Sequence, residues 1–184
     1  MEITNDSKKE TNLFLYHISS KVYQPGEKIL IEDKTEYYKR KEGTHDNWVD
    51  DLLDSSKPNG YLGRQKALYA FDSLENCEKL IGSDKRFNEQ KHFYLVEMKN
   101  PIRVPMCLVN ILLKGGIDSL KNDAIINEYW EPQQSWKCFE YVSNEMIIIQ
   151  EVEAPKNSML LIKAQSDYFA DIDLGKKFVN SINI

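Results

Sequence analysis

The sequence predicts an α+β protein, in which strands and helices are interspersed along the chain. Segments with the two-residue periodicity of strands, or with their aliphatic and aromatic composition, occur throughout, and helix-like segments lie between them. The later strand-like segments are joined by links of hairpin length, which are too short for the crossover helices of a doubly wound sheet. These two observations favour α+β over a parallel α/β architecture.

Seven segments have the character of strands. The first shows it most simply, because Leu13, Leu15 and His17 alternate with Phe14, Tyr16 and Ile18. The predicted strands are Asn12–Ser19, Lys28–Ile31, Lys66–Phe71, His92–Met98, Trp136–Val142, Glu145–Val152 and Met159–Lys163. Pro101 and Pro105 restrict the segment around them to an edge strand or a connection. A tight turn at Ser143-Asn144 joins two of the strands.

Four segments are expected to hold helices. Asp33–Ser56 is highly charged. Trp48 and Leu52 in this segment would face inward, and Val49 is a further candidate for the same face. Ser73 can cap a helix that ends near Gly82. The other two helices are Ile117–Trp130, closed by Pro132, and Ser166–Ile182, weakened by Gly175.

The length of 184 residues fits one domain. We expect a flexible N-terminus over residues 1–11 and a domain over residues 12–165. Residues 166–184 would form a C-terminal helix packed on that domain.

The composition favours a soluble cytoplasmic protein. The chain is 41% hydrophobic and 29% charged, which is typical of globular domains. Its apolar runs are too short to cross a membrane, and the polar first residues lack the apolar core of a secretory signal. Three cysteines without close pairing argue against a disulfide framework. The net charge of −5 gives no overall attraction to nucleic acid.

Metal chemistry is not expected. The three histidines are isolated in the sequence, and the cysteines and histidines lack the spacing of metal ligands.

Four polar side chains interrupt apolar strand-like segments: His17, Tyr69, Glu140 and Glu145. Glu140 shares a strand face with apolar neighbours, so its carboxylate must either face a cleft or be paired. Taken singly, each residue also has an ordinary explanation. His17 and Tyr69 could be hydrogen-bonded core residues, and Glu145 could be a solvated strand end.

In their order and spacing these segments resemble the His–Tyr–Glu branch of the ADP-ribosyltransferases, from about Leu13 to Lys163. More narrowly, Gly63–Tyr69, Phe93–Met98, and Glu128-Tyr129-Trp130 followed by Glu140-Tyr141-Val142 look like an uncharacterised bacterial family that we place in that superfamily. The resemblance implies two packed, mainly antiparallel sheets with flanking helices, and NAD as a substrate.

The resemblance also implies a role for each residue. His17 would bind the adenosine-side ribose or the nicotinamide amide pocket, and Ser19 would add a ribose contact. Tyr69 would stack on the nicotinamide. Arg64 is placed to pair with the pyrophosphate, although a structural ion pair is an equal alternative. The late glutamate would stabilise the positive charge that develops on the ribose.

Two glutamates compete for that last role. Glu140-Tyr141-Val142 is similar to the shorter bacterial and toxin-like members, which favours Glu140. Asn144–Ile149 resembles the catalytic segment of poly(ADP-ribose) polymerases, which would assign the role to Glu145. The sequence departs from the arginine-modifying members, because it has no Ser-Thr-Ser strand and no clear Glu-x-Glu pair before the aliphatic run.

The expected function is therefore mono-ADP-ribosylation of a macromolecular acceptor, which would be RNA, DNA or protein. Such a protein would be a toxin or antiphage effector, with a cognate inhibitor protein as a further partner. The loop Glu128–Trp136 would face the acceptor, or would be an ordinary connection with two packed tryptophans. The alternatives are an RNA 2′-phosphotransferase that uses Arg64 and Arg103, an NAD glycohydrolase, and an inactive binding module.

Overall fold

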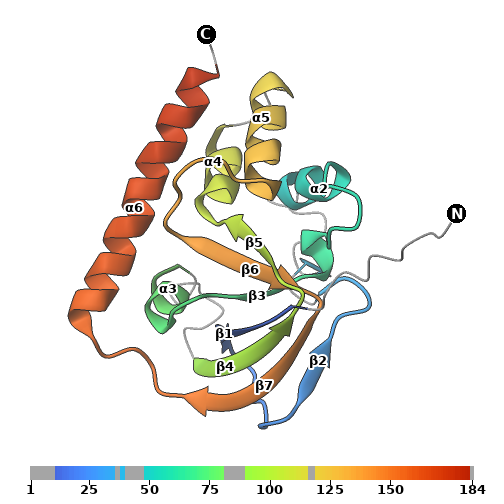
Figure 1. The fold of residues 1–184 in the computed structure, drawn as a ribbon, viewed down its shortest axis with the longest axis vertical. Coiled ribbons are helices and arrows are strands. Elements are labelled where there is room, and N and C mark those ends of the chain that lie inside the picture. The colour runs from blue at the N-terminus through green and yellow to red at the C-terminus, as the bar shows by residue number, and fades with distance from the viewer. Residues whose placement is uncertain (1–10, 36–37, 40–47, 81–89, 116–118, 183–184) are drawn as a thin grey trace, which may run out of the picture.

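The computed structural model describes residues 11–35, 38–39, 48–80, 90–115 and 119–182 (Figure 1). The part expected to be flexible, residues 1–11, therefore lies almost wholly outside the described residues, as does Gly82. The described residues form an α+β structure with two antiparallel sheets and five α-helices, which confirms the predicted class.

Four strands form the larger sheet in the order β1-β4-β7-β2. These strands are β1 Asn12–Ser19, β2 Lys28–Leu30, β4 His92–Lys99 and β7 Glu145–Val152. Alternation of side chains predicted β1, and aromatic and β-branched composition predicted β4; one face of this sheet is buried. That inner face contributes Leu15, Val96 and Ile148 to a core shared with Ala70 of the second sheet.

Three strands form the smaller sheet in the order β3-β6-β5. They are β3 Leu68–Ala70, β5 Ile102–Pro105 and β6 Phe139–Ser143. The prolines hold β5 at the edge, as expected from their missing N–H groups. The Ser143-Asn144 turn does not close a hairpin, because β6 and β7 belong to different sheets, and the turn is the corner between them (Figure 1).

Further contacts join the two sheets. Tyr16 of β1 and Phe71 exchange two backbone hydrogen bonds of 2.8 Å in an isolated bridge. At the corner, the Ser143 hydroxyl donates to the Lys99 carbonyl at 2.5 Å.

The helices cover the smaller sheet and one side of the molecule. They are α2 Trp48–Ser55, α3 Leu74–Leu80, α4 Cys107–Gly115, α5 Ser119–Trp130 and α6 Ser158–Ser181, with the 3₁₀ helix η1 at Arg64–Lys66. Figure 1 shows α2, α4 and α5 gathered on one side of the smaller sheet, and α6 running past α3 and α4. The largest core cluster lies among α2, α4, α5 and the smaller sheet.

Several expectations about the elements were wrong. Met159–Lys163 is the first turn of α6, not a strand, because the Asn157 side chain accepts hydrogen bonds from two backbone N–H groups and caps a helix there. The helix therefore begins well before Ser166. A further difference is the helix α4, which follows Pro105 where only an edge strand or a connection was expected.

Three smaller features of the structure also differ from the sequence-based expectations. β6 begins at Phe139 instead of Trp136, and Arg64–Lys66 forms η1 ahead of β3. In α2 the fully buried residues are Val49 and Leu53, whereas Trp48 and Leu52 are partly buried. Gly175 is a packing position, since a Cβ added there would lie 2.0 Å from Cδ1 of Ile111 in α4.

Within the described part of the chain, the helices are too short or too polar to cross a bilayer.

Asp171 bonds α6 to the segment that leads into β6, the strand that carries Glu140. Its side chain is 1% exposed and accepts hydrogen bonds from the backbone N–H groups of Lys137 at 3.0 Å and Cys138 at 2.7 Å. Replacing Asp171 with Ala would leave the buried N–H of Cys138 and the partly buried N–H of Lys137 without this acceptor.

We predict that Asp171→Ala lowers the free energy of unfolding by about 2 kcal/mol or more, because each unsatisfied buried group costs about 1–3 kcal/mol. Chemical denaturation would measure the change. The matched control is Asp173→Ala on the exposed side of the same helix, where the carboxylate is 71% exposed. Equal effects of the two substitutions would contradict this role for Asp171.

Candidate functional site

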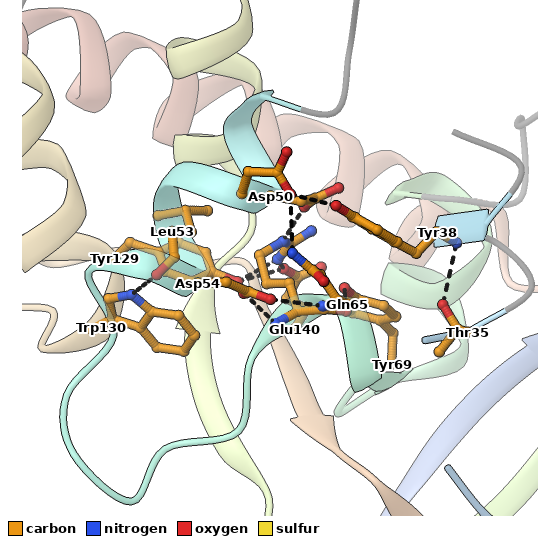
Figure 2. Close-up of polar contacts among 12 residues, drawn as sticks. Thr35, Tyr38, Asp50, Leu53, Asp54, Gln65, Tyr69, Tyr129, Trp130 and Glu140 are labelled. Carbon is orange, nitrogen blue, oxygen red and sulfur yellow. Dashed lines mark hydrogen bonds and ion pairs between the residues drawn. The ribbon is translucent and has the colours of Figure 1, made fainter. Parts of the chain in front are cut away.

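Arg64 belongs to a buried polar cluster between α2, α5 and the smaller sheet. Its partners Asp50, Tyr129 and Glu140 are labelled in Figure 2. It begins η1, whose first N–H groups are held by Asp54 of α2. The Asp54 carboxylate accepts from the backbone N–H of Arg64 at 2.5 Å and from that of Gln65 at 3.1 Å. This cap fixes the backbone from which the Arg64 side chain enters the interior.

The guanidinium of Arg64 contacts two acids and one tyrosine. Its Nε donates to Asp50 Oδ1 at 2.6 Å, and its Nη1 donates to Glu140 Oε1 at 2.5 Å and to the Tyr129 hydroxyl. The Tyr129 hydroxyl in turn donates to Glu140 Oε1 at 3.1 Å. Arg64 is 8% exposed and Glu140 is 4% exposed, so the interactions lie out of water.

The environment of the cluster raises the pKa values of Arg64 and Tyr129. Burial alone would lower the pKa of Arg64. The opposite effect is larger, and it comes from the neighbouring oxygens of Tyr129, Tyr69, Glu140 and Asp50. The pKa of Arg64 therefore lies well above its ordinary value. Burial raises the pKa of the Tyr129 hydroxyl well above its usual range, although Arg64 opposes this shift. Tyr129 is therefore a neutral donor to Glu140 at any ordinary pH.

Tyr69 connects this cluster to the larger sheet, through the contact with His17 of β1. Its hydroxyl donates to the Arg64 carbonyl at 3.1 Å, and its ring centroid lies 5.2 Å from the Arg64 guanidinium carbon. One face of the ring is thus already in contact with a cation. The ring stays partly buried beside the largest core cluster.

His17 reaches Tyr69 from the opposite sheet. Its Nδ1 lies 2.8 Å from the Tyr69 carbonyl oxygen. Because a carbonyl can only accept, Nδ1 carries the proton and the neutral ring presents Nε2 as an acceptor. Burial lowers the pKa of His17, and the bond to Tyr69 only partly offsets this effect.

The structure thus brings together four of the six residues predicted from the sequence. His17, Tyr69, Arg64 and Glu140 form one continuous series of contacts from the larger sheet to the smaller one. Arg64 takes the structural ion pair that was one of its two predicted roles. Glu140 is paired with Arg64, which was one of the two situations expected for it.

Glu145 lies apart from this series. It begins β7, faces away from the core beside Asn12, Glu97, Lys99 and Ile147, and forms an ion pair of 2.9 Å with Lys28. Its side chain is 20% exposed, and that of Lys28 is 54% exposed. This position matches the solvated strand end that was the ordinary explanation for Glu145.

Ser19 lies two residues beyond His17 on the same strand. Its hydroxyl oxygen accepts a hydrogen bond from the backbone N–H of Lys21 at 2.9 Å. The residue is 8% exposed.

The loop expected to face an acceptor is internally bonded. Glu128 Oε1 accepts from the backbone N–H groups of Gln133 and Gln134 and from the Trp136 indole, all within 2.8 Å. Trp130 is 3% exposed and donates its indole N–H to the Leu53 carbonyl at 3.1 Å. These contacts are those of a connection with two packed tryptophans, the ordinary alternative.

Sequence reasoning missed the other members of the cluster, Asp50, Asp54 and Tyr129. Asp50 and Asp54 sit in a helix of many acids, where nothing in the local pattern distinguishes a buried acid from a solvated one. Tyr129 carried one signal, because Glu128-Tyr129-Trp130 was part of the resemblance.

Comparison with known proteins adds no further identification, since neither a protein-family model nor a curated protein matches the chain.

The partly buried His17 makes stability depend on pH. Its pKa in the folded protein lies below the ordinary 6.5, so the unfolded chain binds more protons in the interval between the two values. We therefore predict that His17 contributes a loss of stability as the pH falls through and below about 6.5. Unfolding by urea at pH 7.5 and at lower pH, for wild type and His17→Gln, would show a steeper loss for the wild type. Parallel pH profiles for the two proteins would contradict the assignment.

Proposed function

We propose that this chain is an ADP-ribosyltransferase-like protein that binds NAD and transfers ADP-ribose to a macromolecular acceptor. The observation that carries the proposal is the continuous series from His17 through Tyr69 and Arg64 to Glu140. Residues far apart in the sequence, and ordered as in the His–Tyr–Glu branch, meet where the two sheets join. The α+β architecture with two antiparallel sheets is consistent with that family.

The position of Glu140 suits an electrostatic role. The hydrogen bonds that it accepts from described residues both end on Oε1, from Arg64 and Tyr129. Oε2 receives neither bond and is the atom that would accept from a ribose hydroxyl. A carboxylate already oriented in a poorly solvated place needs no reorganisation when charge develops nearby.

The proposed reaction breaks the bond between nicotinamide and C1′ of its ribose. Nicotinamide leaves with the bonding electron pair, and the ribose becomes an oxocarbenium-like cation that Glu140 stabilises. An oxygen or nitrogen of the acceptor then bonds to C1′ and loses its proton. His17 and Tyr69 would hold the dinucleotide in the orientation that this step requires.

Arg64 is less suited to bind the pyrophosphate of NAD. Two carboxyl groups, Asp50 and Glu140, already share its single positive charge. The same observation weakens the RNA 2′-phosphotransferase alternative, whose other candidate, Arg103, has its guanidinium carbon 3.5 Å from the centre of the Phe139 ring. The acceptor is RNA, DNA or protein, and by analogy with small members of the family the protein would be a toxin or antiphage effector.

One observation favours a second function, an inactive binding module on the same fold. Glu140 is 4% exposed and has a complete structural explanation as a partner of Arg64. A protein of this kind would bind a nucleotide or a partner without cleaving NAD.

Nicotinamide release from NAD distinguishes the two functions. Purified wild type, Glu140→Gln and Glu145→Gln would be incubated with NAD and cell lysate as acceptor, and the fold of each would be checked by circular dichroism. We predict release by the wild type, a loss of about 100-fold or more in Glu140→Gln, and little change in Glu145→Gln.

The other outcomes are equally informative. Loss only in Glu145→Gln would move the catalytic role to Glu145 and contradict the assignment made here. NAD binding without release in any folded sample would establish the binding module instead of the transferase.

A further inference from the structure

The larger sheet ends in two edge strands, β1 and β2, and they differ in what they offer to another strand. β2 is three residues long, and short edge strands leave little backbone for pairing. β1 has eight residues, and Tyr16 in its middle exchanges two backbone hydrogen bonds with Phe71, next to β3. That isolated bridge closes the edge of β1 at Tyr16, and residues 12–14 lie before it.

The bridge shows which way the backbone groups of residues 12–14 point. In an antiparallel strand the N–H and C=O of one residue point to the same side, and the side alternates from residue to residue. The groups of Tyr16 point away from β4, so those of Phe14 and Asn12 do the same. None of the described residues forms a backbone hydrogen bond with these outward N–H and C=O groups.

The side chains at this open edge, residues 12–14, are accessible, and two of the three are apolar. Leu13 is 36% exposed, Phe14 is 66% exposed, and Asn12 is exposed as well. Edges that remain free in natural proteins usually carry a lysine, a proline or a bulge, because an unprotected edge attracts another strand. The open edge has neither lysine nor proline, and its register with β4 continues without a shift. It therefore has the chemistry of a strand-pairing surface.

We propose that the open edges of two copies of this chain pair as antiparallel strands, about a two-fold axis at Leu13. In this register Asn12 of each copy lies opposite Phe14 of the other, so each outward donor meets an outward acceptor. The two Leu13 side chains face each other across the axis, where apolar cross-strand pairs are favourable. The pairing joins the two four-stranded sheets into one continuous sheet.

A second copy fits this edge because the edge is complementary to itself. An axis at Phe14 would require the groups of Tyr16, which already bond to Phe71, and an axis at Asn12 would match a single pair among the described residues. The axis at Leu13 uses all the outward groups of Asn12 and Phe14. The pairing stops at Tyr16, so the contact is small, and small contacts give weak, concentration-dependent association. The inference concerns β1 and does not depend on NAD.

Disulfide cross-linking of Leu13→Cys tests the register directly. Opposite residues in a pair without hydrogen bonds have Cα atoms about 4.5 Å apart, within the range of about 4.4–6.8 Å that a disulfide spans. Val22→Cys is the matched control, because Val22 is 55% exposed and lies outside β1. The native cysteines are buried, so they do not compete in the folded protein.

Sedimentation equilibrium measures the association without a cross-link. Wild type, Phe14→Lys and Val22→Lys would be compared over a wide range of concentrations, with circular dichroism to check the fold. We expect a concentration-dependent dimer for wild type and Val22→Lys, and association weaker by about tenfold or more for Phe14→Lys, because a lysine on an edge strand opposes pairing. Under mild oxidation, Leu13→Cys should form a reducible dimer and Val22→Cys should remain monomeric.

Three results would overturn the proposal. A wild type that is monomeric at every concentration would show that the open edge does not bind a second copy. A dimer that Phe14→Lys leaves unchanged would place the interface on another surface. Equal cross-linking of Leu13→Cys and Val22→Cys would show random collision instead of a fixed register. Each of these results would leave the proposed function intact, since none of them involves NAD.

Discussion

A guanidinium removed from water must be surrounded by acceptors, and the arrangement of the smaller sheet with its helices depends on this constraint at Arg64. The acceptors come from elements that are distant in the sequence: Asp50 from α2, Tyr129 from α5 and Glu140 from β6. Tyr69 of β3 adds its ring and holds the Arg64 carbonyl. The network specifies how these elements meet, because a shift of any one of them would leave a buried charge unpaired.

The same network joins structure to the proposed chemistry. Glu140 is oriented by Arg64 and Tyr129 from one side, and His17 reaches Tyr69 from the other sheet. A transferase needs such a fixed carboxylate, and a rigid binding module would also contain one for stability alone. Nicotinamide release from NAD therefore separates the two functions.

Much of the fold was predictable because local rules apply where one face of an element is buried. Alternation predicted β1, and aromatic and β-branched composition predicted β4. The Ser73 cap predicted α3, and the Asn76 N–H donates to the Ser73 hydroxyl at 3.1 Å. The run Met159–Lys163 was misassigned because a short apolar segment has no period of its own. Asn157, which caps α6, is the residue in the sequence that indicates a helix there. The separation of β6 and β7 into two sheets depends on long-range packing, which a two-residue turn does not encode.

The candidate site was predictable in part for a similar reason. A polar residue in an apolar strand is visible in the sequence, which is how His17, Tyr69 and Glu140 were identified. The partners Asp50 and Tyr129 lie 14 and 65 residues from Arg64 in the sequence. Their contacts with Arg64 exist only in the folded chain, so the local sequence does not indicate them.

A double-mutant cycle on Arg64 and Glu140 tests the central claim most directly. The free energy of unfolding would be measured for wild type, Arg64→Met, Glu140→Gln and the double variant. The account predicts that each single substitution is strongly destabilising and that the double variant is more stable than their sum by about 1 kcal/mol or more, as for groups within one network. Additivity within about 0.5 kcal/mol would contradict the account, because it would show that Arg64 and Glu140 contribute independently.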